Sequence, residues 1–151
     1  MKRWPLPDAM NVALDRARAG AAVGEVPVGA AIVHDGKVIA SAHNLTRTGC
    51  DPTAHAEMAV IREAARVLGA ERLDSCDLYV TLEPCAMCAG AISHARIARL
   101  YYAASDPKGG AVEHGARVFE QPQCLHRPDI YSGMGADEAG TLLRDFFAAR
   151  R

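Results

Sequence analysis

The hydrophobic residues of this chain recur at helical spacing in some segments and at strand spacing in others, so the pattern predicts discrete elements. From residue 8 to residue 20, apolar side chains fall three and four positions apart, which predicts an amphipathic helix. Asp8 is expected to cap the N-terminus of this helix, and Gly20 is expected to end it.

Short apolar runs and further helical patterns alternate along the rest of the chain. Asp35-Gly36 separates two apolar runs and is typical of a tight hairpin turn, and Gly69 is expected to end the second helix. The elements expected are strands at 29–33 and 38–42, a helix at 53–68, a strand at 78–82, a helix at 86–94, a strand at 97–103 and a helix at 137–150. Residues 106–135, rich in Gly, Pro and Gln, are expected to be irregular with at most one short helix.

The order of these elements predicts an α/β protein with a mixed sheet that helices cover. The two strand-helix-strand units predict parallel neighbouring strands joined by right-handed crossovers. No internal repeat, low-complexity tract or linker divides the sequence, so we expect one domain over residues 1–151.

Composition excludes several classes of protein. The chain has 151 residues, of which 50% are hydrophobic and 23% charged, and its net charge of −1 gives no overall indication of a nucleic-acid partner. No apolar run is long enough to cross a membrane, and the N-terminus lacks the apolar core of a secretory signal. Five cysteines, an odd number, argue against a complete disulfide framework. We therefore expect a cytoplasmic protein without a membrane partner.

Two short motifs carry candidate chemistry. His55 and Glu57 form an H-x-E motif near the start of the second expected helix, and Pro84, Cys85 and Cys88 form a P-C-x-x-C motif thirty residues later. One imidazole and two thiolates suit zinc, which accepts nitrogen and sulfur ligands in tetrahedral geometry. Both motifs lie at expected helix N-termini, where the helix dipole favours deprotonated thiols.

Three protein ligands leave one coordination position open, which is typical of a catalytic zinc rather than a structural one. A water at that position would become a source of hydroxide near neutral pH. Glu57 is expected to reach this water from the side and to act as the general acid and base of the reaction.

Other interpretations of these motifs remain open on the sequence alone. A C-x-x-C pair by itself fits either a metal site or a redox pair. A closed structural zinc would need a fourth ligand, for which Cys50, Cys76 or His94 are available. A zinc module that binds RNA without catalysis is a further alternative, and it leaves Glu57 without a role.

The two motifs together are the signature of zinc deaminases. The segments 25–30, 51–57 and 78–91, and a tail with Ala136-Asp137-Glu138 before Phe146-Phe147, resemble the bacterial tRNA adenosine deaminases over roughly residues 8–150. The resemblance implies a three-layer α/β/α fold of the cytidine-deaminase type. It further implies hydrolysis of the wobble adenosine of an arginine tRNA anticodon to inosine, one zinc per subunit and a homodimer.

The resemblance also implies the substrate contacts. Asn44 would hydrogen-bond the flipped base, as would the backbone amide of Ala56, while Pro27 and Val28 would pack against the base. The residues that would touch the nucleotide backbone or the anticodon stem-loop are Asp106, Lys108 and Phe147. An extruded base needs such an apolar slot with an amide that reads its edge.

Each substrate contact has an alternative. Asn44 could bond its own backbone at a strand end, Asp106 could stabilise a turn, and one of Phe146 and Phe147 is expected to belong to the core. Leu125 stands where the family commonly has Asn. The basic residues Lys108, Arg127, Arg144, Arg150 and Arg151 could form a rim for phosphates or an ordinary mixed surface.

The shared motifs also fit a deaminase of a free base or nucleoside, of the guanine or cytosine type. The sequence around His55 and the C-terminal tail favour the tRNA enzyme over this alternative.

Overall fold

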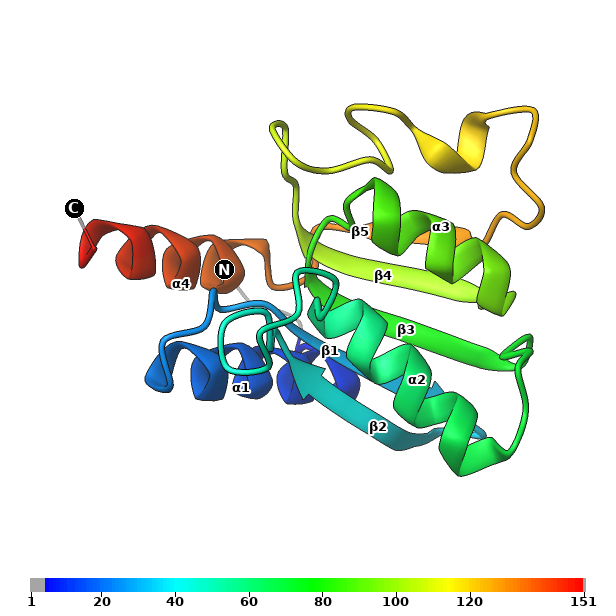
Figure 1. Ribbon diagram of the computed structural model, residues 1–151, viewed down its shortest axis with the longest axis horizontal. Coiled ribbons are helices and arrows are strands. Elements are labelled where there is room, and N and C mark those ends of the chain that lie inside the picture. The colour runs from blue at the N-terminus through cyan, green and yellow to red at the C-terminus, as the bar shows by residue number, and fades with distance from the viewer. Residues whose placement is uncertain (1–4, 151) are drawn as a thin grey trace.

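A five-stranded sheet forms the centre of the computed structural model, which describes residues 5–150 (Figure 1). Its strands are β1 (Gly29–His34), β2 (Lys37–His43), β3 (Cys76–Leu82), β4 (Arg99–Ala104) and β5 (Asp129–Ser132). The helices are α1 (Asp8–Ala22), α2 (Ala56–Leu68), α3 (Ala86–Ala95) and α4 (Ala136–Ala148), with a 3₁₀ turn, η1 (Val118–Glu120). Among the described residues, no helix is long and apolar enough to cross a membrane.

The sheet is mixed, as predicted, with strand order β2-β1-β3-β4-β5. Strand β1 is antiparallel to both β2 and β3, whereas β3, β4 and β5 run parallel. The prediction that α3 joins parallel neighbours is confirmed. The same prediction for α2 is wrong, because β1 lies between β2 and β3 and pairs with both, Ala30 facing Ala42 on one side and Val80 on the other.

Helices cover both faces of the sheet, which gives the predicted three layers. Consecutive residues of a strand point to opposite faces, and Leu78 and Tyr79 show this in β3. Leu78 packs in one cluster with Val60 of α2 and Ile92 of α3, and these two helices cross the face of the sheet nearest the viewer in Figure 1. Tyr79 packs against the second cluster, which α1 and α4 build on the opposite face.

The first helix differs from its prediction at both ends. Its N-cap is Pro7, without a side-chain hydrogen bond, so the prediction that Asp8 caps it is wrong. The helix also passes through Gly20, which is buried, and ends at Ala22. Gly29 explains how closely β1 approaches this helix, since a Cβ there would lie 1.9 Å from the carbonyl oxygen of Ala13.

The second helix begins at Ala56, three residues later than predicted. Asp51 delays it, because its Oδ1 accepts hydrogen bonds from the backbone N–H and the hydroxyl of Thr53, at 2.8 and 2.7 Å, and holds them in a turn. His55 consequently stays extended as the N-cap. The end at Gly69 is confirmed, in the left-handed conformation that the prediction requires.

The remaining predictions hold except in one segment. The Asp35-Gly36 turn is confirmed, with positive φ angles of 50° and 74° at its two residues, as a tight hairpin needs. Residues 106–135 contain the short helical turn η1 but also β5, which the sequence analysis missed. Strand β5 has four residues, mostly exposed, and it is held by pairing with β4.

Candidate active site

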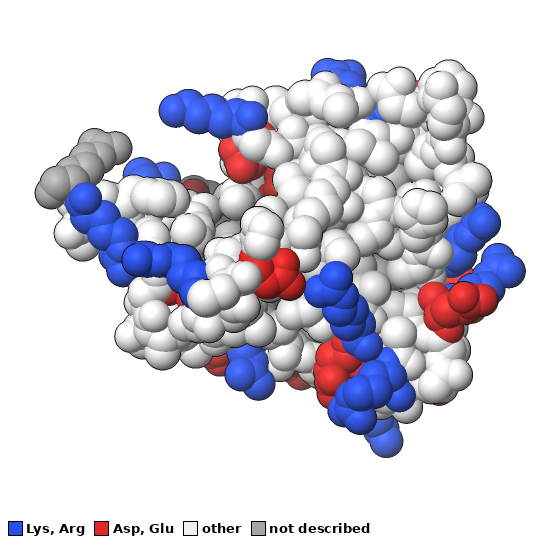
Figure 2. Space-filling view, in the orientation of Figure 1, with Lys and Arg blue, Asp and Glu red and all other residues white. Residues whose placement is uncertain are grey.

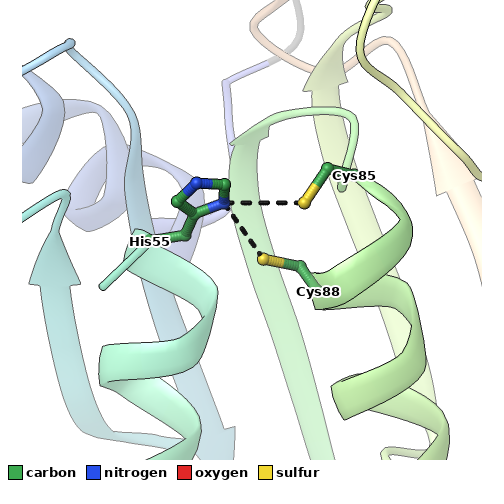
Figure 3. Close-up of side chains that lie close together, drawn as sticks. All are labelled: His55, Cys85 and Cys88. Atoms are coloured by element: carbon green, nitrogen blue, oxygen red, sulfur yellow. Dashed lines mark hydrogen bonds between the residues drawn. The ribbon is translucent and has the colours of Figure 1, made fainter. Parts of the chain in front are cut away.

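The N-termini of α2 and α3 bring His55, Cys85 and Cys88 together (Figure 3). His55 and Cys85 are the N-cap residues of the two helices, and Cys88 lies in the first turn of α3. The Nδ1 atom of His55 lies 3.5 Å from the Sγ of Cys85 and 3.4 Å from the Sγ of Cys88. Residues thirty positions apart in the sequence thus point at one another.

These distances fit a shared zinc ion. Zinc bonds to sulfur at about 2.3 Å and to nitrogen at about 2.0 Å, so a sulfur and a nitrogen ligand at a tetrahedral angle lie about 3.5 Å apart. The observed separations are close to this value, and the donor set is one that zinc prefers. Among residues 5–150, these three are the only His, Cys, Asp and Glu side chains grouped closely enough to hold a metal. Cys50, Cys76 and His94 therefore supply no fourth ligand.

Hydrogen bonds within the cluster favour the thiolate form of Cys85. The hydrogen bond with Cys88 lowers the pKa of Cys85 to about 4, and the hydrogen bond with His55 adds to this effect. The bond with Cys85 and the burial of the side chain raise the pKa of the Cys88 thiol. The contact with Cys85 raises the pKa of His55. A metal ion would displace the shared protons, since ligands bind zinc in their deprotonated forms.

Glu57 lies in the first turn of α2 with only 4% of its surface exposed. Burial raises the pKa of its carboxyl group above the ordinary value. A carboxyl group that can hold a proton nearer neutral pH suits a general acid and base.

A pocket of about 320 Å³ opens over this cluster. Its lining residues are Val26, Val28, Asn44, Thr46, His55, Glu57, Leu82, Glu83, Cys85, Asp106 and Gly109. The pocket thus contains two of the three predicted ligands, the predicted acid–base and three of the predicted substrate contacts. A larger hollow, of about 550 Å³, lies near Glu71, His94 and Arg96 and includes none of these groups.

Asn44 is oriented by the backbone of α2. Its Oδ1 accepts a hydrogen bond from the N–H of Ala56 at 2.8 Å, and the side chain is 9% exposed. The amide nitrogen of Asn44 is therefore the group that the pocket receives. The Ala56 N–H, for which the resemblance implies a base contact, is already engaged with Asn44.

The other predicted substrate residues lie at different distances from the pocket. Pro27 is buried beside Val28 but is absent from the lining. Asp106 lines the pocket and also stabilises its own turn, because its Oδ1 accepts from the N–H groups of Lys108 and Gly109. Lys108 is exposed outside the pocket.

One of the two phenylalanines of α4 belongs to the core, as predicted, and the other is exposed. Phe146 is 7% exposed and lies under the guanidinium of Arg150, 3.5 Å from its ring centroid, whereas Phe147 is 47% exposed. Their rings meet edge to face, with centroids 5.3 Å apart. Phe147 is the ring available for a partner.

Sequence reasoning missed two buried glutamates. Glu25 is fully buried and accepts hydrogen bonds from the N–H of Arg47 and from the N–H and hydroxyl of Thr48. Burial alone would raise the pKa of Glu25, but these hydrogen bonds outweigh it and lower the pKa. Glu83, which precedes Pro84, is 2% exposed and lines the pocket. Their only signal in the sequence is a charged residue inside an otherwise apolar run.

The family model for the cytidine and deoxycytidylate deaminase zinc-binding region matches residues 6–104. A tRNA-specific adenosine deaminase of Agrobacterium fabrum is 59% identical over 142 residues, covering 94% of this chain and 93% of the relative. That of Bacillus subtilis is 42% identical and covers 94% of this chain and 88% of the relative.

Two solved structures define the similarity in three dimensions. One comes from biochemical and structural studies of A-to-I editing by tRNA:A34 deaminases at the wobble position of transfer RNA. It has a TM-score of 0.89 and 59% sequence identity, and the match covers 90% of this chain and 99% of that one. The guanine deaminase of Bacillus subtilis has a TM-score of 0.65 and 37% identity, covering 95% of this chain and 92% of that one.

Proposed function

The chain belongs to the cytidine and deoxycytidylate deaminase family and groups within it with the tRNA-specific adenosine deaminases, and from this premise we propose that it hydrolyses the wobble adenosine of an arginine tRNA to inosine. The observation that carries the proposal is the placement of Glu57 in one pocket with His55 and Cys85, beside Cys88. This arrangement combines a metal-binding triad with a buried acid–base, which is what hydrolytic removal of an amino group requires.

His55, Cys85 and Cys88 would hold one zinc per subunit. When bound, zinc supplies a water made acidic enough to act as a nucleophile near neutral pH. Glu57 would take one proton from the water and deliver it to N1 of the adenine as the C6–O bond forms. It would then take the remaining proton of the new C6 hydroxyl and give it to the amino group, which leaves as ammonia as the C6 carbonyl forms. Water and adenosine thereby become inosine and ammonia.

The pocket residues would orient the base. Val28 offers an apolar wall, and the Asn44 amide nitrogen can donate to a ring nitrogen or a ribose oxygen because Ala56 fixes the other end of the amide. Pro27, which is buried next to Val28 in the chain, would support this wall. An adenosine extruded from an anticodon loop would enter such a slot edge first.

The surroundings of the pocket suit a folded RNA. Figure 2 shows basic side chains at the left of the molecule, over α4, the helix that carries Arg144 and the exposed Phe147. We assign phosphate contacts to Lys108 and a contact with the anticodon stem-loop to Phe147, while Asp106 would meet the nucleotide. A cytoplasmic homodimer completes the proposal, in accord with the soluble tRNA substrate.

A deaminase of free guanine is the second candidate, because the guanine deaminase of Bacillus subtilis shares the fold and 37% of the aligned residues. The tRNA enzyme is favoured, since its relatives reach 59% identity and a TM-score of 0.89.

Nucleoside analysis of an arginine tRNA transcript tests the choice between them. Zinc-loaded protein is incubated with a transcript that carries A at the wobble position, with a matched transcript that carries G there, and with free guanine, adenosine and cytosine. The proposal predicts inosine from the first transcript alone. Ammonia release from guanine with both transcripts unchanged would establish the second candidate.

A further inference from the structure

The carboxylate of Glu83 gathers a whole segment of the chain around itself. Its Oε2 accepts hydrogen bonds from the backbone N–H groups of Val112, Glu113 and His114 at 3.0–3.1 Å. Its Oε1 accepts from the N–H of Asp106 at 3.0 Å and meets Nδ1 of His114 at 2.7 Å. The side chain of Glu83 is completely buried. Hydrogen bonds to a buried carboxylate are stronger than those between neutral groups.

The remaining contacts close residues 106–114 over this carboxylate. The N–H of Ala111 donates to the carbonyl of Pro84 at 2.8 Å. Gly110 permits the approach, because a Cβ there would lie 2.5 Å from Cδ of Glu83.

The far end of the segment is tied to the sheet. The hydroxyl of Tyr102, a fully buried residue of β4, donates to Oε1 of Glu113. His114 remains partly exposed, with 36% of its side chain accessible, although it contacts Glu83. His114 can therefore be replaced with little disturbance of the core, and it is the side chain of this network that contacts the Glu83 carboxylate directly.

The segment forms one wall of the pocket and carries none of its chemistry. Asp106 and Gly109 line the pocket, with Lys108 exposed between them. The metal-binding residues and Glu57 come instead from the N-termini of α2 and α3. A displacement of the segment would thus change how a nucleotide is held and leave the reacting groups in place.

We propose that Glu83 and His114 are positioning residues, which together hold residues 106–110 as the wall that receives the nucleotide. This inference rests on the proposed function, because the wall affects turnover only if the pocket receives the tRNA nucleotide. The hydrogen bond between the His114 imidazole and the Glu83 carboxylate fixes the segment at residue 114.

A pair of variants at position 114 isolates this hydrogen bond. His114→Ala removes the donor, whereas His114→Asn keeps an N–H group at the place of Nδ1. Trypsin reports the position of the segment without any need for activity, because cleavage after the exposed Lys108 releases residues 109–151. We expect this cleavage to be about tenfold faster in His114→Ala and within about twofold of wild type in His114→Asn.

Kinetics on the tRNA transcript supply the second readout. His114→Ala should raise KM about tenfold with kcat within about twofold, and His114→Asn should restore KM. Zinc content should stay unchanged in both variants. A KM that rises equally in both variants, or cleavage after Lys108 that changes in neither, would overturn the proposal.

Glu25→Gln is the control for a hydrogen-bond network weakened elsewhere in the protein. Glu25 holds the backbone of Arg47 and Thr48, not the 106–114 segment. Trypsin should therefore cut this variant faster after Arg47, with cleavage after Lys108 unchanged. If wild-type protein leaves the tRNA unmodified, the proposed function fails, while the trypsin result still decides whether Glu83 and His114 hold the wall.

Discussion

Asn44 Oδ1 accepts a hydrogen bond from the backbone N–H of Ala56 at 2.8 Å, and this bond joins the substrate pocket to the first turn of the helix that carries Glu57. Ala56 is fully buried, so its N–H has no access to water. A single amide side chain thus satisfies one of the free N–H groups of α2 and presents its own nitrogen to the pocket. Asn44 has a structural role through its oxygen and a proposed substrate role through its nitrogen.

Two substitutions separate these roles. Asn44→Ala leaves the Ala56 N–H buried without a partner, which should cost about 1–3 kcal/mol of stability. Asn44→Asp keeps the acceptor for the Ala56 N–H, so it should lose less stability than Asn44→Ala. It lacks the amide donor, so its activity on the tRNA should be lost. Chemical denaturation and inosine formation measure the two effects. Full activity in Asn44→Asp would exclude the substrate role of the amide nitrogen.

Glu57→Gln should retain zinc and lose the reaction. The substitution preserves the shape of the side chain but cannot carry a proton, and general acid–base groups contribute about 10²- to 10⁴-fold to turnover. Elemental analysis should therefore find the wild-type zinc content in this variant, whereas its rate of inosine formation should fall. Retention of more than about a tenth of the wild-type rate would assign proton transfer to another group.

The two phenylalanines of α4 should respond in opposite ways. Phe146→Ala removes a buried ring and should destabilise the protein by about 3 kcal/mol. Phe147→Ala should change stability by less than about 0.5 kcal/mol, because that ring is largely exposed, and should raise KM for the tRNA. Thermal unfolding and steady-state kinetics test both. An unchanged KM in Phe147→Ala would remove this residue from the tRNA surface.

Glu25 should contribute to the loss of stability in acid. Because the folded-state pKa of Glu25 lies below its ordinary value of 4.5, its contribution is present above pH 4.5 and disappears as the pH falls through the folded-state pKa. Glu25→Gln should lower stability at neutral pH and make the acid limb of the unfolding curve less steep. Glu71→Gln, an exposed position, serves as the control and should follow wild type.

The residues that could hold the metal could be predicted because the signal of each motif is local. Cys85 precedes Cys88 by three positions, and His55 precedes Glu57 by two, so each motif can be recognised within a few residues of sequence. The supporting carboxylates could not be predicted in this way. The hydrogen-bonding partners of Glu25 lie 22 and 23 residues away, and those of Glu83 lie 23 to 31 residues away, so only the fold brings them together.

The strand order and the existence of β5 likewise could not be predicted from the sequence. Hydrophobic pattern located β1 and β2, but nothing in the pattern indicates that β1 lies between β2 and β3. Strand β5 has mostly exposed positions and therefore no alternation to detect. Its pairing with β4 across four residues is what makes it a strand.

The most direct test of the central claim is a zinc titration of metal-free protein, with inosine formation on the wobble-A transcript as the readout. We predict no inosine without zinc, a linear rise as zinc is added, and a plateau at about one ion per chain. Glu57→Gln should bind the same amount of zinc and form no inosine. Inosine formation that is independent of zinc would contradict the account. So would zinc-dependent consumption of free guanine while the transcript stays unmodified.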